Sequence, residues 1–443
     1  MADYTYFWGC QIPARFPFIE KATRLAMDQL GIVCHDLDGF TCCPEKTLIK
    51  CMDERIWLLT AARNLAVAEA AGRDVVTLCN ECYGVLHGVA KKLKGEPGLK
   101  ADLNADLERV GLHIGHGVEV LHIVELLANR IGYDELRNRL GAPLRGMRIA
   151  VHYGCHMTQP SDETGFDDPL EPTTLDELVT ALGGTSIDYE TKLLCCGGAL
   201  SNVGEQEESM ALARKKLLEL RDLGADAILL TCPACFLQYD QRQYIMIKKG
   251  EELDIPILYV PELLALAAGA RPEEIGLEGH RVGTDSFVEK LQRTRERFAA
   301  ISEKFDLSLL EMCYNCGACV ADCPVAESTP AFDPQAIIGR ILDGDIESLI
   351  SGPEIWYCVQ CHTCYEMCPQ RFGMDGPINT LRLLATAAGH MPSGLRLGIS
   401  AFEKTGLLAA PDERQRKKLG LGAAPQSGYE QWRALLESLE TRE

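Results

Sequence analysis

Eight of the 20 cysteines in this chain fall in two runs of identical spacing toward its C-terminal end. Both runs read Cys-x2-Cys-x2-Cys-x3-Cys-Pro, and their cysteines are Cys313, Cys316, Cys319 and Cys323, then Cys358, Cys361, Cys364 and Cys368. This spacing is typical of bacterial ferredoxins, in which three thiolates hold one [4Fe-4S] cube and the fourth, before proline, ligates the other cube. The runs therefore predict two cubane clusters with exchanged fourth ligands: Cys313, Cys316, Cys319 and Cys368 for one, and Cys358, Cys361, Cys364 and Cys323 for the other.

Two other kinds of metal site use similar cysteine patterns. Structural zinc also takes four cysteines. A zinc site, however, does not require three cysteines at this spacing followed by Cys-Pro, and here that pattern occurs in two copies. Cys358, Cys361 and His362 match the C-x-x-C-H pattern of c-type haem attachment. That match lies inside a complete cluster run, and the first residues show no basic region and apolar stretch of an export signal. Iron–sulfur clusters are the favoured interpretation.

Ten further cysteines form two sets of five in the first two thirds of the chain. The sets are Cys10, Cys42, Cys43, Cys79 and Cys82, then Cys155, Cys195, Cys196, Cys232 and Cys235. In both sets 35 residues separate the adjacent pair from the C-x-x-C, which indicates an internal duplication. Neighbouring cysteines rarely both reach one iron of a compact cube, and five thiolates exceed what one cube needs. The spacing predicts a larger or distorted iron–sulfur assembly in each copy; a thioredoxin-like role for the C-x-x-C pairs is the alternative.

Short apolar segments precede these cysteines and predict how they are positioned. Residues 4–8 and 148–153 are expected to be strands that end at Gly-Cys, and residues 75–78 and 227–231 are expected to be buried strands that run into the C-x-x-C pairs. Segments rich in Ala, Leu and charge, about 49–71 and 205–223, predict helices between them. Sites in α/β sheets lie at the carboxyl ends of strands, so the five thiols of a copy would converge at one sheet edge.

The region around the two ferredoxin runs predicts a mainly α-helical module. Asp333 before Pro334 is typical of a helix start, Ile337 and Ile341 belong to an apolar stripe that follows, and a helical pattern covers about 285–310. We predict duplicated α/β Cys-Cys-Gly domains followed by a mainly α-helical ferredoxin-like domain. The expected parts are 1–145 and 146–270 (the two copies), 271–285 (a linker), 286–395 (the ferredoxin module) and 396–443 (a C-terminal tail).

Net charge and the length of the apolar runs restrict the kinds of binding partner and the cellular location. Sixty-four acidic against 44 basic residues give a net charge of −20, whereas a protein that reads a phosphate backbone usually carries a basic face. We therefore expect no nucleic-acid partner. The chain has no apolar run of 18 or more residues, so no membrane span is expected. The first residues also show no signal peptide, so a cytoplasmic location is predicted unless a partner carries the protein to a membrane.

Taken together, these motifs resemble heterodisulfide reductase. The doubled five-cysteine pattern is similar to that of its B-type subunit, and the pair of ferredoxin runs is similar to its C-type subunit, fused in that order over about residues 1–395. The resemblance implies that each complete set of five cysteines binds a noncubane [4Fe-4S] cluster. Gly197 after Cys196 keeps the family's glycine, whereas Pro44 follows Cys43; this departure leaves all the ligands in place. Related lactate- and glycolate-oxidising proteins share the Cys-Cys-Gly domain.

The resemblance also implies an activity. The two noncubane clusters would clamp and reductively split a disulfide, and the two cubane clusters would relay electrons to them. No G-x-G-x-x-G turn follows a strand, so electrons would enter from a partner that resembles the flavin- and cluster-containing A-type subunit, possibly joined by a hydrogenase or formate dehydrogenase. The alternative is a non-catalytic electron-transfer module of a larger electron-bifurcating or ring-reducing complex. Four clusters predict ~16 iron atoms per chain.

Residues outside the four cysteine motifs are candidates for proton donation, substrate binding or purely structural roles. His156 directly follows Cys155 and is expected to pack around the ligands, the catalytic alternative being that it donates a proton to a departing thiolate. Arg15 and Lys192 would bind an anionic substrate tail or remain solvated charges. Cys34 and Cys51 lie outside the four motifs and are expected to be structural.

Overall fold

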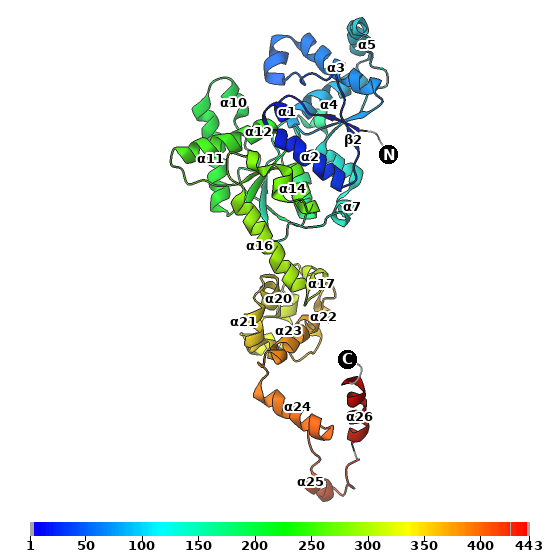
Figure 1. Cartoon of the computed structure of the whole chain (residues 1–443), viewed down its shortest axis with the longest axis vertical. Helices are drawn as coiled ribbons and strands as arrows, with labels where there is room; N and C mark the ends of the chain where they lie inside the picture. The colour runs from blue at the N-terminus through cyan, green and yellow to red at the C-terminus, as the bar shows by residue number, and fades with distance from the viewer. Residues whose placement is uncertain (1–3, 426, 441–443) are drawn as a thin grey trace. The chain divides into compact units, whose positions relative to one another are not determined.

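The computed structural model describes residues 4–425 and 427–440. It divides the chain into two compact units, Met1–Arg295 and Glu296–Glu443, and the boundary falls within helix α16 (Asp285–Ser302) (Figure 1). The first unit contains two parallel β-sheets and the second is helical.

The two sheets of the first unit have the same topology. Their strand orders are β2-β1-β3-β4 and β6-β5-β7-β8, with every neighbouring pair parallel. The strands are β1 (Tyr4–Phe7), β2 (Cys34–His35), β3 (Asp74–Thr77), β4 (Val120–His122), β5 (Arg148–Val151), β6 (Thr185–Ile187), β7 (Ala227–Leu230) and β8 (Ile257–Tyr259). This repetition is the structural counterpart of the duplicated cysteine spacing, and it confirms the predicted α/β class.

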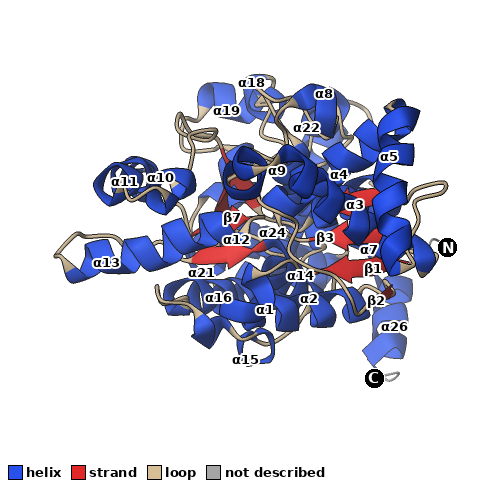
Figure 2. Ribbon diagram, turned by 90° about the horizontal axis from the view of Figure 1, so that it is seen from above, coloured by secondary structure: helices blue, strands red, loops and turns tan. Residues whose placement is uncertain are grey.

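Helices cover the sheets because each has an apolar face to bury. In α3, Asp53 caps the first turn by accepting a hydrogen bond from the backbone N–H of Ile56, and the buried face includes Ala61 and Leu65. Figure 2 shows β1, β3 and β7 enclosed by helices. The principal helices of the first copy are α1 (Gln11–Arg15), α2 (Pro17–Gln29), α3 (Glu54–Ala70), α4 (Asn80–Gly95), α5 (Pro97–Leu107), α6 (Ile123–Glu125) and α7 (Tyr133–Asn138).

The second copy repeats this arrangement. Its helices are α8 (Ser161–Thr164), α9 (Thr174–Ala181), α10 (Gly198–Asn202), α11 (Gln206–Asp222), α12 (Pro233–Phe236), α13 (Gln243–Lys248), α14 (Val260–Ala268) and α15 (Pro272–Ile275). Helix α14 packs against α2 of the first copy. The side chains of Ile275 and Leu277 are buried in the core of this same unit. The domain boundaries drawn from the sequence, including a linker over 271–285, remain predictions.

The second unit has helices and no strand among its described residues. Its helices are α17 (Leu307–Glu311), α18 (Ala318–Ala321), α19 (Pro324–Ser328), α20 (Pro334–Leu342), α21 (Ile346–Ser351), α22 (Thr363–Met367), α23 (Asp375–Ala387), α24 (Ser393–Thr405), α25 (Glu413–Lys418) and α26 (Tyr429–Glu440). Asp333 caps α20 by accepting a hydrogen bond from the N–H of Ala336 at 2.9 Å, as predicted. Ile337 and Ile341 are buried in the core of the unit, beside Leu349 and Ile378.

Helix α20 offers a test of the capping role of Asp333. Asp333→Ala removes the acceptor for an N–H in the first turn, which costs about 1 kcal/mol of local stability. We expect amide hydrogens of residues 334–342 to exchange about fivefold faster in the full-length protein, measured by hydrogen–deuterium exchange and mass spectrometry. Asp343→Ala is the control, because Asp343 is exposed just beyond the last residue of α20. Equal exchange rates in the two variants would contradict the capping role.

Candidate metal centres

The first five-cysteine set gathers at the carboxyl end of the first sheet. Strand β1 ends three residues before Cys10, and β3 ends two residues before Cys79, which precedes the first residue of α4. The Sγ atoms of Cys10 and Cys42 are 3.7 Å apart. Cys43 is in hydrogen-bond contact with both Cys42 and Cys82, and Cys82 with Cys79. All five thiols of the set therefore form one connected group.

Gly9 explains part of this packing. It has a φ of +66°, and a Cβ at its position would lie 2.9 Å from the Sγ of Cys82. Only glycine permits both that backbone conformation and so close an approach to a thiol.

The second set gathers in the same way at the second sheet. Strand β7 ends two residues before Cys232, which precedes α12, and the Sγ atoms of Cys235 and Cys196 are 3.4 Å apart. Cys196 also contacts Cys195. Cys155 is close enough for its charge to raise the pKa of Cys195, although contact with Cys196 and burial are the larger causes. The structure thus brings the second set together as it does the first.

The two sets meet each other. Cys79 and Cys232, which occupy corresponding positions in the two copies, are in side-chain hydrogen-bond contact. The hydroxyl of Tyr259 in the second copy donates to the carbonyl of Leu78 in the first. Asn80 of the first copy donates from its side chain to the carbonyl of Tyr153 in the second, at 2.6 Å. Ten thiols from two sheets therefore form one continuous site within the first unit.

Crowding shifts the pKa values of these thiols in opposite directions. Contact with Cys43 and Cys79, together with burial, raises the pKa of Cys82 well above its usual range. Cys43 instead accepts hydrogen bonds from Cys42 and Cys82, which lower its pKa to about 6. One ionised thiol in such a group makes its neighbours keep their protons. All five become thiolates only when a metal centre displaces those protons.

The donor set suits iron and sulfur. None of the 20 cysteines, all of which lie among the described residues, forms a disulfide. The two sets supply only thiols at the distances given above, and soft thiolate donors are the preferred ligands of iron–sulfur clusters. Their arrangement therefore fits the cofactor that the cysteine spacing predicts.

An ion pair connects the two sets on their more exposed side. His156, next to Cys155, pairs through Nδ1 with the carboxylate of Glu81, which lies between Cys79 and Cys82. Burial disfavours the imidazolium, but the Cys155 thiolate and the Glu81 carboxylate outweigh it and raise the pKa of His156 to about 10. Glu81 also accepts from the backbone N–H of Lys46 at 3.1 Å. The imidazole of His156 is thus held between Cys155 and Glu81.

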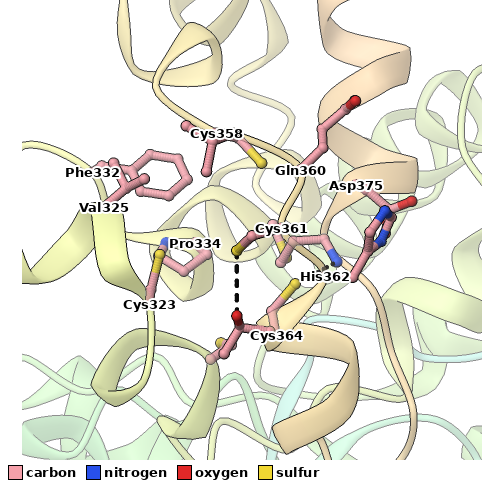
Figure 3. A pocket seen from close by; sticks show the side chains of 14 residues that line it. Cys323, Val325, Phe332, Pro334, Cys358, Gln360, Cys361, His362, Cys364 and Asp375 are labelled. Carbon is pink, nitrogen blue, oxygen red and sulfur yellow. Dashed lines mark hydrogen bonds and ion pairs between the residues drawn. The ribbon is translucent and has the colours of Figure 1, made fainter.

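The eight ferredoxin-type cysteines of the second unit line two cavities of similar volume. A cavity of ≈ 380 Å³ is lined by Cys313, Cys316, Cys319 and Cys368. A cavity of ≈ 400 Å³ is lined by Cys323, Cys358, Cys361 and Cys364, and Cys319 reaches this one as well. Figure 3 shows the second cavity with Val325, Phe332 and Pro334 beside the four thiols. Each cavity thus combines three cysteines of one run with the fourth of the other.

Other polar residues near the motifs have structural partners. Lys192 pairs with Asp176 at 2.8 Å and lies over the ring of Tyr153, so it is not a free cation at the site. His122 is fully buried, and its Nδ1 accepts from the N–H of Val124. Cys34 lies on β2, and Cys51 is exposed with its Sγ 3.7 Å from the carbonyl of Lys46.

One buried cation was missed by sequence reasoning. Lys216 lies on α11 and is completely inaccessible to solvent beside the second set. In the sequence it is half of a Lys-Lys pair on a charged helix, which usually indicates a solvated face. The available signal is helical spacing, since Lys216 falls in line with Ala213, Leu217 and Leu220 on the buried face of α11.

Comparison with known proteins agrees with this architecture. Residues 4–87 and 149–240 each match a family described as "Cysteine-rich domain", and residues 309–372 match a "4Fe-4S dicluster domain". The B-type subunit of the "Ferredoxin/F(420)H(2)-dependent CoB-CoM heterodisulfide reductase" of Methanosarcina acetivorans is 39% identical over 293 residues, which are 66% of this chain and 97% of that protein. The chain belongs to the family of heterodisulfide reductase B-type subunits.

The remainder of the chain resembles a second subunit of the same enzymes. The C2 subunit of the "H(2)/formate:CoB-CoM heterodisulfide,ferredoxin reductase" of Methanococcus maripaludis is 30% identical over 128 residues, 29% of this chain and 68% of that protein. This heterodisulfide reductase homologue is therefore a fused B- and C-like iron–sulfur protein. A more distant relative, the "8-methylmenaquinol:fumarate reductase membrane anchor subunit" of Wolinella succinogenes, is 28% identical over 62% of this chain and 95% of its own length. No helix in the described part of this chain is both long and apolar enough to cross a membrane.

The ligand grouping in the C-like part can be tested by single substitutions. We expect Cys368→Ala and Cys316→Ala to alter the same cubane signal in EPR spectra of the reduced protein, because both thiols line one cavity. Cys323→Ala and Cys361→Ala should together alter the other signal. Cys51→Ala is the control and should alter neither. If Cys368→Ala changed the same signal as Cys361→Ala, the exchanged arrangement would be wrong.

Proposed function

We propose that this protein is the disulfide-cleaving component of a heterodisulfide reductase-type complex. It would reduce RS–SR′ to two thiols, RSH and R′SH, with two electrons from a partner and two protons. The observation that carries the proposal is the meeting of two complete five-thiol sets through Cys79 and Cys232. Such a site would hold two one-electron centres, one for each sulfur of the substrate.

The ligand assignment of the first unit follows the two sets. Cys10, Cys42, Cys43, Cys79 and Cys82 would hold one noncubane [4Fe-4S] cluster, and Cys155, Cys195, Cys196, Cys232 and Cys235 would hold the other. When bound, these clusters supply single electrons and an iron site with affinity for sulfur. The protein's own contribution is to fix the ten thiols on the rigid ends of parallel strands, which preorganises the site.

The C-like part would carry electrons to this site. Two cubane [4Fe-4S] clusters, held by the exchanged sets of cysteines described above, would form the relay. Electrons would come from a flavin-containing protein similar to the A-type subunit, since relatives are named as subunits of larger reductases that also use ferredoxin, hydrogen or formate. A cytoplasmic location suits the free thiols, which need a reducing compartment.

Substrate turnover is the direct test of the activity. The anaerobic, cluster-loaded protein should oxidise reduced viologen when the CoB–CoM disulfide or another disulfide is added, with two electrons consumed per disulfide and two thiols released. Viologen absorbance and a thiol assay measure these quantities. Absence of turnover with every disulfide tried, while electrons still pass between protein partners, would contradict the enzymatic assignment.

Proton delivery is proposed for His156. Glu81 pairs with the imidazole and holds it in place beside Cys155. The ring would give its proton to the first thiolate released, and Glu81 is a positioning residue. This arrangement is confined to one copy, since Gln11 and Ala234 occupy the corresponding positions in the other.

Substitution of His156 tests this role. Loss of a positioned general acid typically lowers a rate by about 100-fold or more, so His156→Gln should reduce kcat for disulfide reduction by about that factor. The EPR spectra of all clusters should stay unchanged. His113→Gln is the matched control, because His113 is exposed and far from the cysteines in sequence. A kcat equal to that of the unmodified protein would exclude the role.

An electron-relay function is the second candidate. The observation in its favour is the likeness to a subunit of a menaquinol:fumarate reductase, whose name indicates electron exchange with a quinol. In that case the noncubane pair would pass electrons onward within a larger complex. Two complete, adjoining five-thiol sets favour catalysis, because a relay has little need for two open centres facing each other.

A further inference from the structure

The two five-thiol sets differ in the basic side chain that the neighbouring helix supplies. Lys216 precedes Cys232 by 16 residues, and Arg63 precedes Cys79 by the same interval, so the two residues occupy corresponding positions on α11 and α3. Lys216 is 0% exposed. Arg63 is half-buried, and its guanidinium donates to the carbonyl of Gly39 and to Oδ1 of Asn64. Only the second set therefore has a fully buried cation at this position.

Lys216 has two hydrogen-bond partners. Its Nζ donates to the carbonyl of Lys192 at 2.8 Å and lies 2.8 Å from the Nδ1 of His152. The ammonium also lies over the rings of Tyr189 and Tyr239, at 5.4 and 5.9 Å from the ring centres. Burial lowers the pKa of Lys216 to about 7. In the protonated form the ammonium has no acceptor, so Nδ1 of His152 accepts and the neutral ring carries its proton on Nε2.

His152 connects this cation to the thiols. It is 2% exposed, and a ring nitrogen lies within 4.8 Å of the Sγ atoms of Cys196 and Cys235. The Nε2 atom of His152 is buried and completes no hydrogen bond with a described residue, although Cys196 lies close to the ring. With Nδ1 occupied by Lys216, the N–H at Nε2 is the one available to the neighbouring sulfurs.

The first set has an apolar side chain in place of this imidazole. Phe7 precedes Cys10 by three residues, as His152 precedes Cys155. Phe7 is 1% exposed and packs its ring edge-to-face on Phe40, with ring centres 5.1 Å apart. The duplicated scaffold therefore places a phenyl group next to the first set and a buried lysine–imidazole pair next to the second.

We propose that Lys216 and His152 are positioning residues that make the second five-thiol set easier to reduce than the first. A buried positive charge and N–H donors to sulfur both stabilise the more negative, reduced state of an iron–sulfur centre, and both raise its reduction potential. The first electron from the relay would then reside at the second set, and the two sulfurs of the substrate would meet inequivalent centres. This inference rests on the proposed cluster assignment.

Redox titration of the full-length, cluster-loaded protein, followed by EPR, tests the inference. In Lys216→Met, which replaces the ammonium by a neutral chain of similar length, we expect the midpoint potential of one noncubane centre to fall while the other three clusters keep theirs. Lys216→Arg, which retains the charge, should show a smaller change. Arg63→Met is the matched control at the corresponding position and should leave all midpoints unchanged.

The outcomes separate this inference from the proposed function. Unchanged midpoints in Lys216→Met, or equal shifts of both noncubane centres, would overturn it while leaving the disulfide reductase assignment intact. A wild-type protein without two noncubane signals would overturn both. If Lys216→Met fails to take up clusters, His152→Phe provides the measurement, because it gives the second set the phenyl group of the first. A downward shift of one midpoint supports the inference, and no shift excludes it.

Discussion

The structure of the first unit depends on one constraint, which is that ten thiols must be held close together without forming disulfides. Thiolates at 3.4–3.7 Å repel each other, and the opposite pKa shifts of Cys43 and Cys82 show how few of them ionise unaided. The scaffold meets this constraint by placing the cysteines at the carboxyl ends of parallel strands, where backbone positions are fixed by the sheet.

Duplication explains how two sets come to face each other. Each copy supplies the same strand order, the same interval between Cys-Cys and C-x-x-C, and contacts to the other copy from the end of its strands, such as Tyr259 to Leu78. The copies have then diverged at the positions that surround the thiols. Glu81 and His156 lie on one side of the site, and Lys216 and His152 lie behind the second set. A symmetric scaffold with asymmetric surroundings suits a reaction in which two halves of a disulfide differ.

Much of the fold and of the cysteine grouping was predictable from the sequence, because the patterns that indicate them are local or have a fixed spacing. The strands before Cys10 and Cys79, the cap at Asp333 and the helical character of the second unit follow from short-range patterns. The contact between Cys79 and Cys232 is not predictable in this way, since it joins residues 153 positions apart through the packing of two sheets. Lys216 was missed for a related reason, because burial of a charge depends on neighbours such as Lys192 and His152 from other elements. From the sequence, Lys192 is either a solvated charge or a substrate-binding cation, and its pairing with Asp176 is visible only in the structure.

An anomalous difference map at the iron absorption edge, from crystals grown and frozen without oxygen, would show whether the ten thiols hold two iron–sulfur clusters. We expect two separate groups of four iron atoms in the first unit, one bonded to the five sulfurs that include Cys43 and the other to the five that include Cys196. A map with either group missing, with a single metal ion in its place, or with those cysteines joined as disulfides would show that the cluster assignment is wrong.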